Sequence, residues 1–145
     1  MRAVIQRVDS ASVNIGETTV GSCGRGFLIL LGVGENDTEE EVEKLWAKIF
    51  KMRIFPDGEH HTGASLADVA GEVLVISQFT LYADCRKGNR PSFVGAAAPD
   101  LASPLVDRFV ELLKEQGVPT QTGVFGAHMD VDLLNSGPVT IILEY

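Results

Sequence analysis

Three polar side chains stand together at the end of an apolar stretch, where they could take part in chemistry. The stretch from Val73 to Tyr82 reads V-L-V-I-S-Q-F-T-L-Y, and its first four residues are typical of a strand buried on both faces. Ser77, Gln78 and Thr80 follow, and a buried hydroxyl or amide without a partner costs about 1 to 3 kcal/mol. These side chains therefore either bond to neighbouring backbone or face a pocket in which a ligand supplies the bond. We interpret the whole stretch as one strand.

Basic residues form a second group with a possible role in binding. Arg86, Lys87 and Arg90 lie in a loop directly after this strand, beside the candidate pocket. The formal net charge is -8, which argues against a broad nucleic-acid surface but leaves room for a local one. The other basic cluster, at residues 48–53, is expected at the C-terminal end of a helix, where cations offset the helix dipole.

No metal or cofactor is expected. His60 and His61 are adjacent in a polar loop, but no further Cys or His stands at ligand spacing. The dinucleotide-binding, P-loop and nucleophile-elbow motifs are all absent from the sequence.

The composition is that of an ordinary globular protein of 145 residues, with 45% hydrophobic and 22% charged residues. A chain of this length predicts a single domain, residues 1–145, with a sizeable core. The longest apolar run, Gly26 to Gly34, is too short to span a bilayer. Because the chain goes straight into strand-like sequence after Met1, we expect a cytoplasmic protein with Cys23 and Cys85 as reduced thiols.

The elements that must position these residues can be read from the hydrophobic pattern. A helix is expected after Asp37, because Thr38 and Glu41 stand at capping-box spacing and an apolar stripe follows. A second helix is expected over 101–116, before Gly117. Besides the strand described first, strands are expected at residues 2–8, 11–15, 18–21, 26–33, 118–122, 129–133 and 139–143. This order predicts an α/β domain with mixed β-sheets and two helices packed on one face.

Asn135-Ser136-Gly137-Pro138 lies between the last two expected strands, and alone it indicates a turn. Together with Ser77-Gln78-Phe79-Thr80-Leu81 it is more specific. The pair resembles S-Q-F-T-L and N-x-G-P-[VF]-T, the two signature motifs of the D-aminoacyl-tRNA deacylase (D-tyrosyl-tRNA deacylase) family. The opening M-R-A-V-I-Q-R-V, the L-G-V-G of residues 31–34, R-K-G-N-R-P-S-F and T-G-V-F-G-A-H-M are also similar to the family. One departure is Gly63, where family members usually carry Asn.

The resemblance implies an enzyme that hydrolyses the ester joining a D-amino acid to the 3′-terminal ribose of tRNA, and that also removes mischarged glycine. It implies a homodimer in which a cis Gly137-Pro138 corner reaches into the partner's pocket and rejects L-amino acids. A bond before proline can be cis at a cost of about 0.5 to 1 kcal/mol. By the same resemblance Ser77, Gln78, Gly137 and Pro138 bind substrate, Arg7 orients the corner, and Arg86, Lys87 and Arg90 contact tRNA phosphates.

For the chemistry, the resemblance points to Thr80 and Phe79. The Thr80 hydroxyl could be a nucleophile, but neither motif contains a His or Lys to act as its base, and we expect a structural role for His128. The alternative is that the 2′-hydroxyl of the RNA activates water while amides near Phe79 and Thr80 stabilise the oxyanion. We favour the second version. Phe79 would then pack beside the terminal adenosine.

Two other classes of function stay open. A non-catalytic module that binds nucleotides or nucleic acid could use the same fold, since a fold does not fix a function. A general Ser/Thr esterase would turn over simple esters without needing the RNA.

Overall fold

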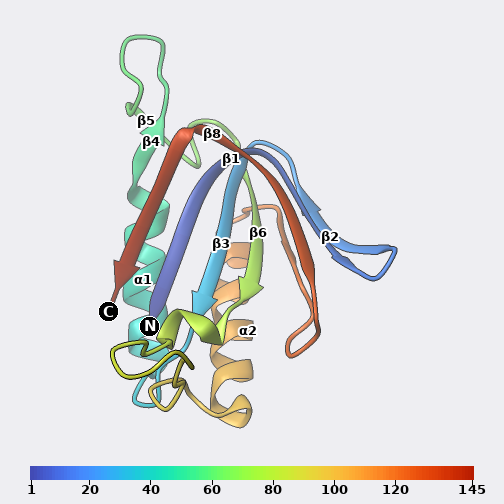
Figure 1. Ribbon diagram of the computed structural model, residues 1–145. Helices are drawn as coiled ribbons and strands as arrows, with labels where there is room; N and C mark the ends of the chain where they lie inside the picture. Colours follow the sequence, from blue (N-terminus) through green and yellow to red (C-terminus); the bar gives the residue numbers. More distant parts are fainter.

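A curved six-stranded sheet with two helices on one face makes up the protein, as a computed structural model of residues 1–145 shows (Figure 1). The sheet has the order β2-β1-β3-β6-β7, with β8 paired to β1, and β4 and β5 form a separate two-stranded sheet. The strands are β1 (Arg2–Ile15), β2 (Thr18–Cys23), β3 (Gly26–Gly32), β4 (Arg53–Phe55), β5 (Ala64–Ser65), β6 (Glu72–Ser77), β7 (Thr120–Thr122) and β8 (Asp130–Glu144). The helices are α1 (Glu39–Lys51), the short 3-10 helix η1 (Phe79–Tyr82) and α2 (Pro99–Glu115).

The sheet is mixed, as the sequence predicts. β3 pairs with β6 and β6 with β7 in parallel, whereas the pairs that involve β1 are antiparallel. The parallel connections need crossovers, and α1 and α2 supply them.

The two longest strands bend over one end of the sheet, and here the expected strand boundaries are wrong. The segments 2–8 and 11–15 form one strand, β1, and the segments 129–133 and 139–143 belong to one strand, β8. β8 follows β1 on both sides of the bend, with Ala3 opposite Leu143 and Val13 opposite Val131. The register shifts between Gln6 and Ser10, so the bend is an irregularity inside a continuous pairing. Gly137-Pro138 lies in this bend and not in a turn between separate strands.

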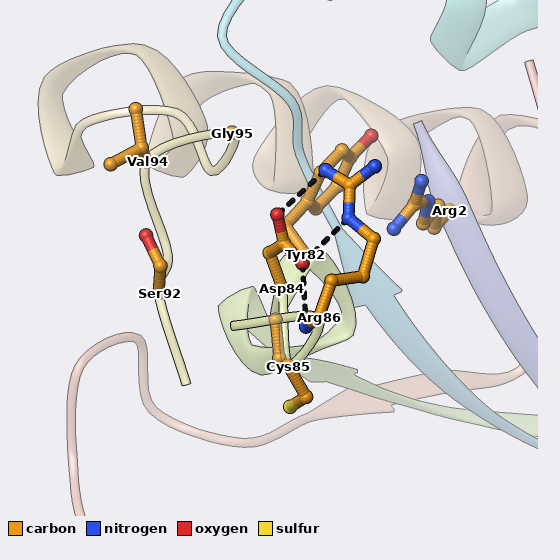
Figure 2. Close-up of a pocket in the computed structure, with 9 residues that line it drawn as sticks. Arg2, Tyr82, Asp84, Cys85, Arg86, Ser92, Val94 and Gly95 are labelled. Carbon is orange, nitrogen blue, oxygen red and sulfur yellow. Dashed lines mark hydrogen bonds and ion pairs between the residues drawn. The ribbon is translucent and has the colours of Figure 1, made fainter. Parts of the chain in front are cut away.

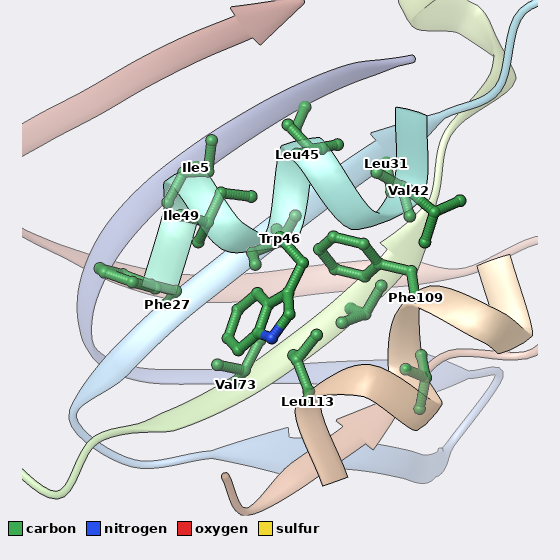
Figure 3. Packing of buried hydrophobic residues seen from close by; sticks show 14 of the residues in the cluster. Ile5, Phe27, Leu31, Val42, Leu45, Trp46, Ile49, Val73, Phe109 and Leu113 are labelled. Carbon is green, nitrogen blue, oxygen red and sulfur yellow. The ribbon is translucent and has the colours of Figure 1, made fainter. Parts of the chain in front are cut away.

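The two helices begin and end close to the predicted positions and cover one face of the sheet. The capping box is present, because Thr38 accepts from the first turn of α1 while Glu41 accepts from the Thr38 amide. Trp46 of α1 packs edge-on against Phe109 of α2, with ring centroids 5.8 Å apart (Figure 3). Inward side chains of β1, β3 and β6 complete this core, among them Ile5, Phe27 and Val73 (Figure 3). No helix is long and apolar enough to cross a membrane.

The face of the sheet that the helices leave free is covered by the bent ends of its own long strands. A smaller cluster joins Val13 of β1, Cys23 of β2, Leu28 of β3 and Ile76 of β6, and Met129 packs against it. Because β1 and β8 bend, their far halves close over this face. Both cysteines are free, as expected, with Cys23 buried and Cys85 exposed.

Candidate functional site

The strand that carries the first signature motif ends earlier than predicted. β6 stops at Ser77, and Phe79 to Tyr82 form η1 instead of continuing the strand. The last bond to the sheet runs from the Gln78 amide to the Leu31 carbonyl, 2.8 Å. The 3-10 turn then directs Phe79 outward, so that its side chain is 57% exposed. The Phe93 ring packs against Phe79 and is 36% exposed, so two apolar rings lie side by side at the surface, as is typical of a binding surface.

A cavity of about 570 Å³ opens beside this turn. Ser77, Gln78 and Phe79 line its mouth, and the rest of the lining is mostly apolar. The remaining lining residues include Leu31, Val33, Ile76, Phe93, Ala96, Ala97, Ala102, Val106, Phe125, Met129 and Val131. His128 is the one ionisable side chain in the lining. We refer to this cavity as the apolar pocket. It is large enough for a nucleoside-sized ligand with an apolar face.

Thr80 is exposed and is not part of the apolar pocket's lining. The side-chain amide of Gln78 donates a hydrogen bond to the Thr80 hydroxyl oxygen. That oxygen therefore already serves as an acceptor, and no His, Lys, Asp or Glu side chain bonds to it. An activated nucleophile needs a base within hydrogen-bond reach, and the arrangement provides none.

The second signature motif forms a corner whose shape depends on Arg7. The Gly137-Pro138 peptide bond is cis, and both residues are exposed at the bend of β8. The Arg7 side chain is 7% exposed and donates to three carbonyl groups, those of Ser136 (3.0 Å), His61 (3.2 Å) and Ile54. The side-chain amide of Asn135 donates to the carbonyls of Arg7 and Val139, both at 3.0 Å. These contacts fix the main chain on each side of the corner.

Gly137 is required at this corner for two reasons. Its φ is +118°, a value that side-chain-bearing residues rarely adopt. A Cβ on residue 137 would also lie 2.4 Å from Nη2 of Arg7.

The two signature segments lie at opposite ends of the sheet within one chain. The pairings of β1, β3 and β6 put Arg7 opposite Phe27, Phe27 opposite Val73, and Leu31 opposite Ser77. The corner is therefore level with the start of β6, about 13 Å along the strands from Ser77 and three strand spacings to the side. Figure 1 shows the same separation, with the bend of β8 at one end of the sheet and η1 at the other. Residues 77–80 and 137–138 of one chain do not meet.

The hairpin that contains Gly63 lies beside the corner, on the Arg7 side. The Gly63 amide donates to the Phe55 carbonyl at 2.8 Å, and its own carbonyl accepts from Arg53. A Cβ on residue 63 would lie 1.7 Å from Oδ2 of Asp57. A side chain at position 63 would therefore have to displace the Asp57 carboxylate, which accepts from the amides of Glu59 and His60.

The basic loop folds back next to the apolar pocket, but its three cations differ. Arg86 is paired with Asp84 through two contacts of 2.9 and 2.7 Å, and it lowers the pKa of that carboxyl group. Lys87 and Arg90 form no ion pair. Backbone bonds between Asp84 and Ser92 close the loop. At its end, the Phe93 ring meets Phe79 edge-on, with centroids 5.1 Å apart.

Sequence reasoning assigned no role to several residues of the pocket. Phe93, Phe125 and Met129 all contribute to its wall. They lie in R-K-G-N-R-P-S-F and T-G-V-F-G-A-H-M, two segments that resemble the family outside its signature motifs. The aromatic residue in each of these otherwise polar loops could have indicated a pocket wall, since a large apolar side chain is unfavourable in water unless it packs against something. His128 is exposed and belongs to the lining of the apolar pocket.

Comparisons with known proteins identify the family of this chain. The profile of the family described as D-Tyr-tRNA(Tyr) deacylase matches residues 4–144. A D-aminoacyl-tRNA deacylase of Thermotoga petrophila is 55% identical over 99% of this chain and 97% of its own length. One of Desulfatibacillum aliphaticivorans is 56% identical over 99% of both chains.

Two solved structures share the fold over nearly the whole chain. A c-Myc DNA unwinding element binding protein has a TM-score of 0.94 and 40% identity, and covers 100% of this chain and 99% of its own. A structure described as a probable eukaryotic D-amino acid tRNA deacylase has a TM-score of 0.85, and covers 98% of this chain and 97% of its own. At 19% identity this second likeness shows the fold alone.

The curated relatives of this chain are deacylases, and its α/β scaffold holds an apolar pocket with polar side chains in the lining. The protein is therefore a hydrolytic enzyme. The chain belongs to the D-Tyr-tRNA(Tyr) deacylase family.

Proposed function

We propose that this enzyme hydrolyses the ester bond between a D-amino acid, or glycine, and the 3′-terminal ribose of tRNA. The observation that carries the proposal is the pair of signature segments, one at the mouth of the apolar pocket and one in an exposed corner held by Arg7. Relatives at 55 and 56% identity are named for this reaction, which supports it. Charged tRNA is a cytoplasmic substrate, so we place the enzyme there.

We infer that the functional unit is a homodimer in which the corner of one protomer enters the apolar pocket of its partner. The separation of the two segments within one chain supports this, because neither can complete a site alone. Apolar side chains are also exposed on and beside β8: Leu134 is 59%, Ile142 71% and Tyr145 45% exposed. Burial of this patch would supply the hydrophobic free energy of association.

Chirality would be read by main-chain atoms. A pocket that accepts many D-amino acids cannot depend on contacts with the side chain, since each shape-specific contact discriminates by about 1 to 3 kcal/mol. Carbonyl groups at Gly137 and its neighbours can bind the α-ammonium and leave space for a hydrogen or a D side chain. An L side chain would collide with the same main chain. Glycine, which has no side chain, would enter the site.

Hydrolysis would use the RNA's own 2′-hydroxyl to activate water. The Thr80 hydroxyl has no base beside it and accepts a bond from Gln78, which favours a positioning role over nucleophilic attack. The amides of Phe79 and Thr80 lie in the first turn of η1, where N–H groups have no intrahelical partner. There they can donate to the oxyanion of the tetrahedral intermediate. Ser77 and Gln78 would bind the substrate at the mouth, and Phe79 would pack on the terminal adenosine.

The loop that follows η1 would contact the acceptor phosphates of tRNA. Lys87 and Arg90 are unpaired and can do so directly, whereas Arg86 must first exchange its bond to Asp84. Three cations imply a shallow dependence of tRNA affinity on salt. An affinity that did not change with salt would contradict this assignment.

The decisive experiment compares D-Tyr-tRNA with L-Tyr-tRNA. We expect rapid release of D-tyrosine and no measurable release of L-tyrosine. Equal rates for the two would overturn chiral proofreading. Release of neither would favour a binding module, the reading suggested by the name of the DNA unwinding element binding protein. The net charge of -8 and the few unpaired cations do not favour that reading. A tRNA with a 2′-deoxy terminal adenosine should be inert, whereas a simple esterase would hydrolyse it.

A further inference from the structure

A second cavity of about 740 Å³ lies on the other side of η1 and is polar (Figure 2). It is lined by two guanidinium groups, by the Tyr82 ring, by Ser92 and by the main chain that follows Tyr82. Its lining residues are Arg2, Tyr82, Ala83, Asp84, Cys85, Arg86, Ser92, Val94 and Gly95. We refer to it as the polar cavity. The hydrolytic step described above does not use it.

The polar cavity and the apolar pocket share one wall. η1 contributes Phe79 to the apolar pocket and Tyr82 to the polar cavity. The segment after the basic loop alternates in the same way, with Phe93 facing the apolar pocket and Ser92 and Val94 facing the polar cavity. The two cavities therefore lie next to each other, separated by η1 and by the segment that contains Ser92 and Phe93.

Arg2 is fixed in the polar cavity with donors to spare. It bonds to Glu144 through Nε (2.9 Å) and Nη2 (2.8 Å), and to the Leu81 carbonyl through Nη1 (3.0 Å). Its guanidinium lies 4.6 Å from the centroid of the Tyr82 ring. A guanidinium carries five N–H groups, so two remain for a ligand. A fixed guanidinium with free N–H groups suits a phosphate, to which it can donate charge-assisted hydrogen bonds.

Arg86 is the second cation of the polar cavity, and its present partner is easily exchanged. The Arg86 side chain is 88% exposed and that of Asp84 is 44% exposed. Figure 2 shows the bonds between them. Water and salt screen such a pair strongly, so it contributes little to stability. A phosphate that enters the cavity can therefore take over Arg86 at small cost.

We propose that the polar cavity binds the nucleotide that precedes the terminal adenosine, with Arg2 and Arg86 on its phosphodiester group. This inference rests on the proposed function, because it takes the aminoacylated adenosine to occupy the apolar pocket. The substrate is then bound as two successive nucleotides of a single strand, one on each side of the wall formed by η1. The first nucleoside is held through its apolar face and the second through its charge.

Two small esters test this directly. D-tyrosyl-adenosine carries the terminal nucleoside alone, and the D-tyrosyl ester of cytidylyl-adenosine adds one phosphodiester and one nucleoside. We expect kcat/KM to be at least about tenfold higher for the dinucleotide, the effect of one charge-assisted hydrogen bond. Arg86→Gln and Arg2→Lys should each reduce this ratio. Arg108→Gln removes a partly exposed, ion-paired arginine on α2 and should keep the ratio.

The outcomes separate this inference from the proposed function. If both esters are hydrolysed at equal kcat/KM, the polar cavity does not bind the second nucleotide, while the deacylase activity stands. A ratio that persists in Arg86→Gln and in Arg2→Lys overturns the inference in the same way. If neither ester nor D-Tyr-tRNA is hydrolysed, the proposed function fails and the inference fails with it.

Discussion

The guanidinium of Arg7 occupies the space into which a side chain on Gly137 would project, with Nη2 2.4 Å from the position of that Cβ. Arg7 belongs to β1 and Gly137 to β8, and the two meet only where both strands bend. The exposed corner therefore depends on a buried cation and on a residue without a side chain. This relationship leads to the first two predictions.

Gly137→Ala should strongly reduce activity. Alanine at φ +118° costs about 1 to 3 kcal/mol in backbone strain, and its Cβ must also displace Arg7. A displacement of about 1 Å in a positioning group can cost about 100-fold in rate, and we expect at least that loss in kcat/KM on D-Tyr-tRNA. Gly58→Ala is the matched control, because Gly58 has a φ of +98° but no atom within 4 Å of the added Cβ. Equal activity of the two variants would contradict the role of the corner.

Arg7→Met should destabilise the protein and reduce activity. It leaves the carbonyls of Ser136, Ile54 and His61 without their donor, and we expect the free energy of unfolding to fall by about 2 to 5 kcal/mol. Urea unfolding measures this loss. Arg7→Lys keeps the charge but cannot donate to three divergent carbonyls, so it should recover only part of the lost free energy of unfolding. Arg108→Met, at an exposed ion pair, should unfold as the unaltered protein does.

Thr80→Ala should remain active. Loss of a covalent nucleophile typically costs about a million-fold in kcat, whereas loss of a positioning hydroxyl costs far less. We expect a decrease of about tenfold or less in single-turnover deacylation of D-Tyr-tRNA, because nothing beside the hydroxyl can act as its base. A variant that binds D-Tyr-tRNA normally but no longer turns it over would establish Thr80 as the nucleophile.

The two cysteines should differ in reactivity. Burial raises the pKa of the Cys23 thiol to about 11, so that it stays protonated and inert near pH 8. Titration of the native protein with a chromogenic disulfide should detect one fast thiol, Cys85, and the second only after unfolding. Because the pKa of Cys23 is higher in the folded state, its contribution to stability is complete below about pH 8.5 and is lost as the pH rises toward 11. Two fast thiols at pH 8 would contradict this assignment.

The helices and the buried strands could be predicted because their signals are local. The capping box at Thr38 and the apolar stripe around Trp46 specify α1 within its own segment, and both are present. The alternation in β1 and the apolar run of β3 likewise identify strands. Local signals were misleading where the chain changes direction. The sequence of η1 predicts a strand, and the sequence at the bend of β8 predicts a turn.

The sequence by itself determined the fold class, the mixed sheet and the two signature segments, because hydrophobic periodicity and short motifs are properties of neighbouring residues. Only the tertiary structure decided where β6 ends, which carbonyls Arg7 binds, and that residues 77–80 lie at the opposite end of the sheet from residues 137–138. It also paired Arg86 with Asp84 and left a polar cavity on the far side of η1. These features arise from contacts between residues far apart in the chain, for which no local pattern carries information.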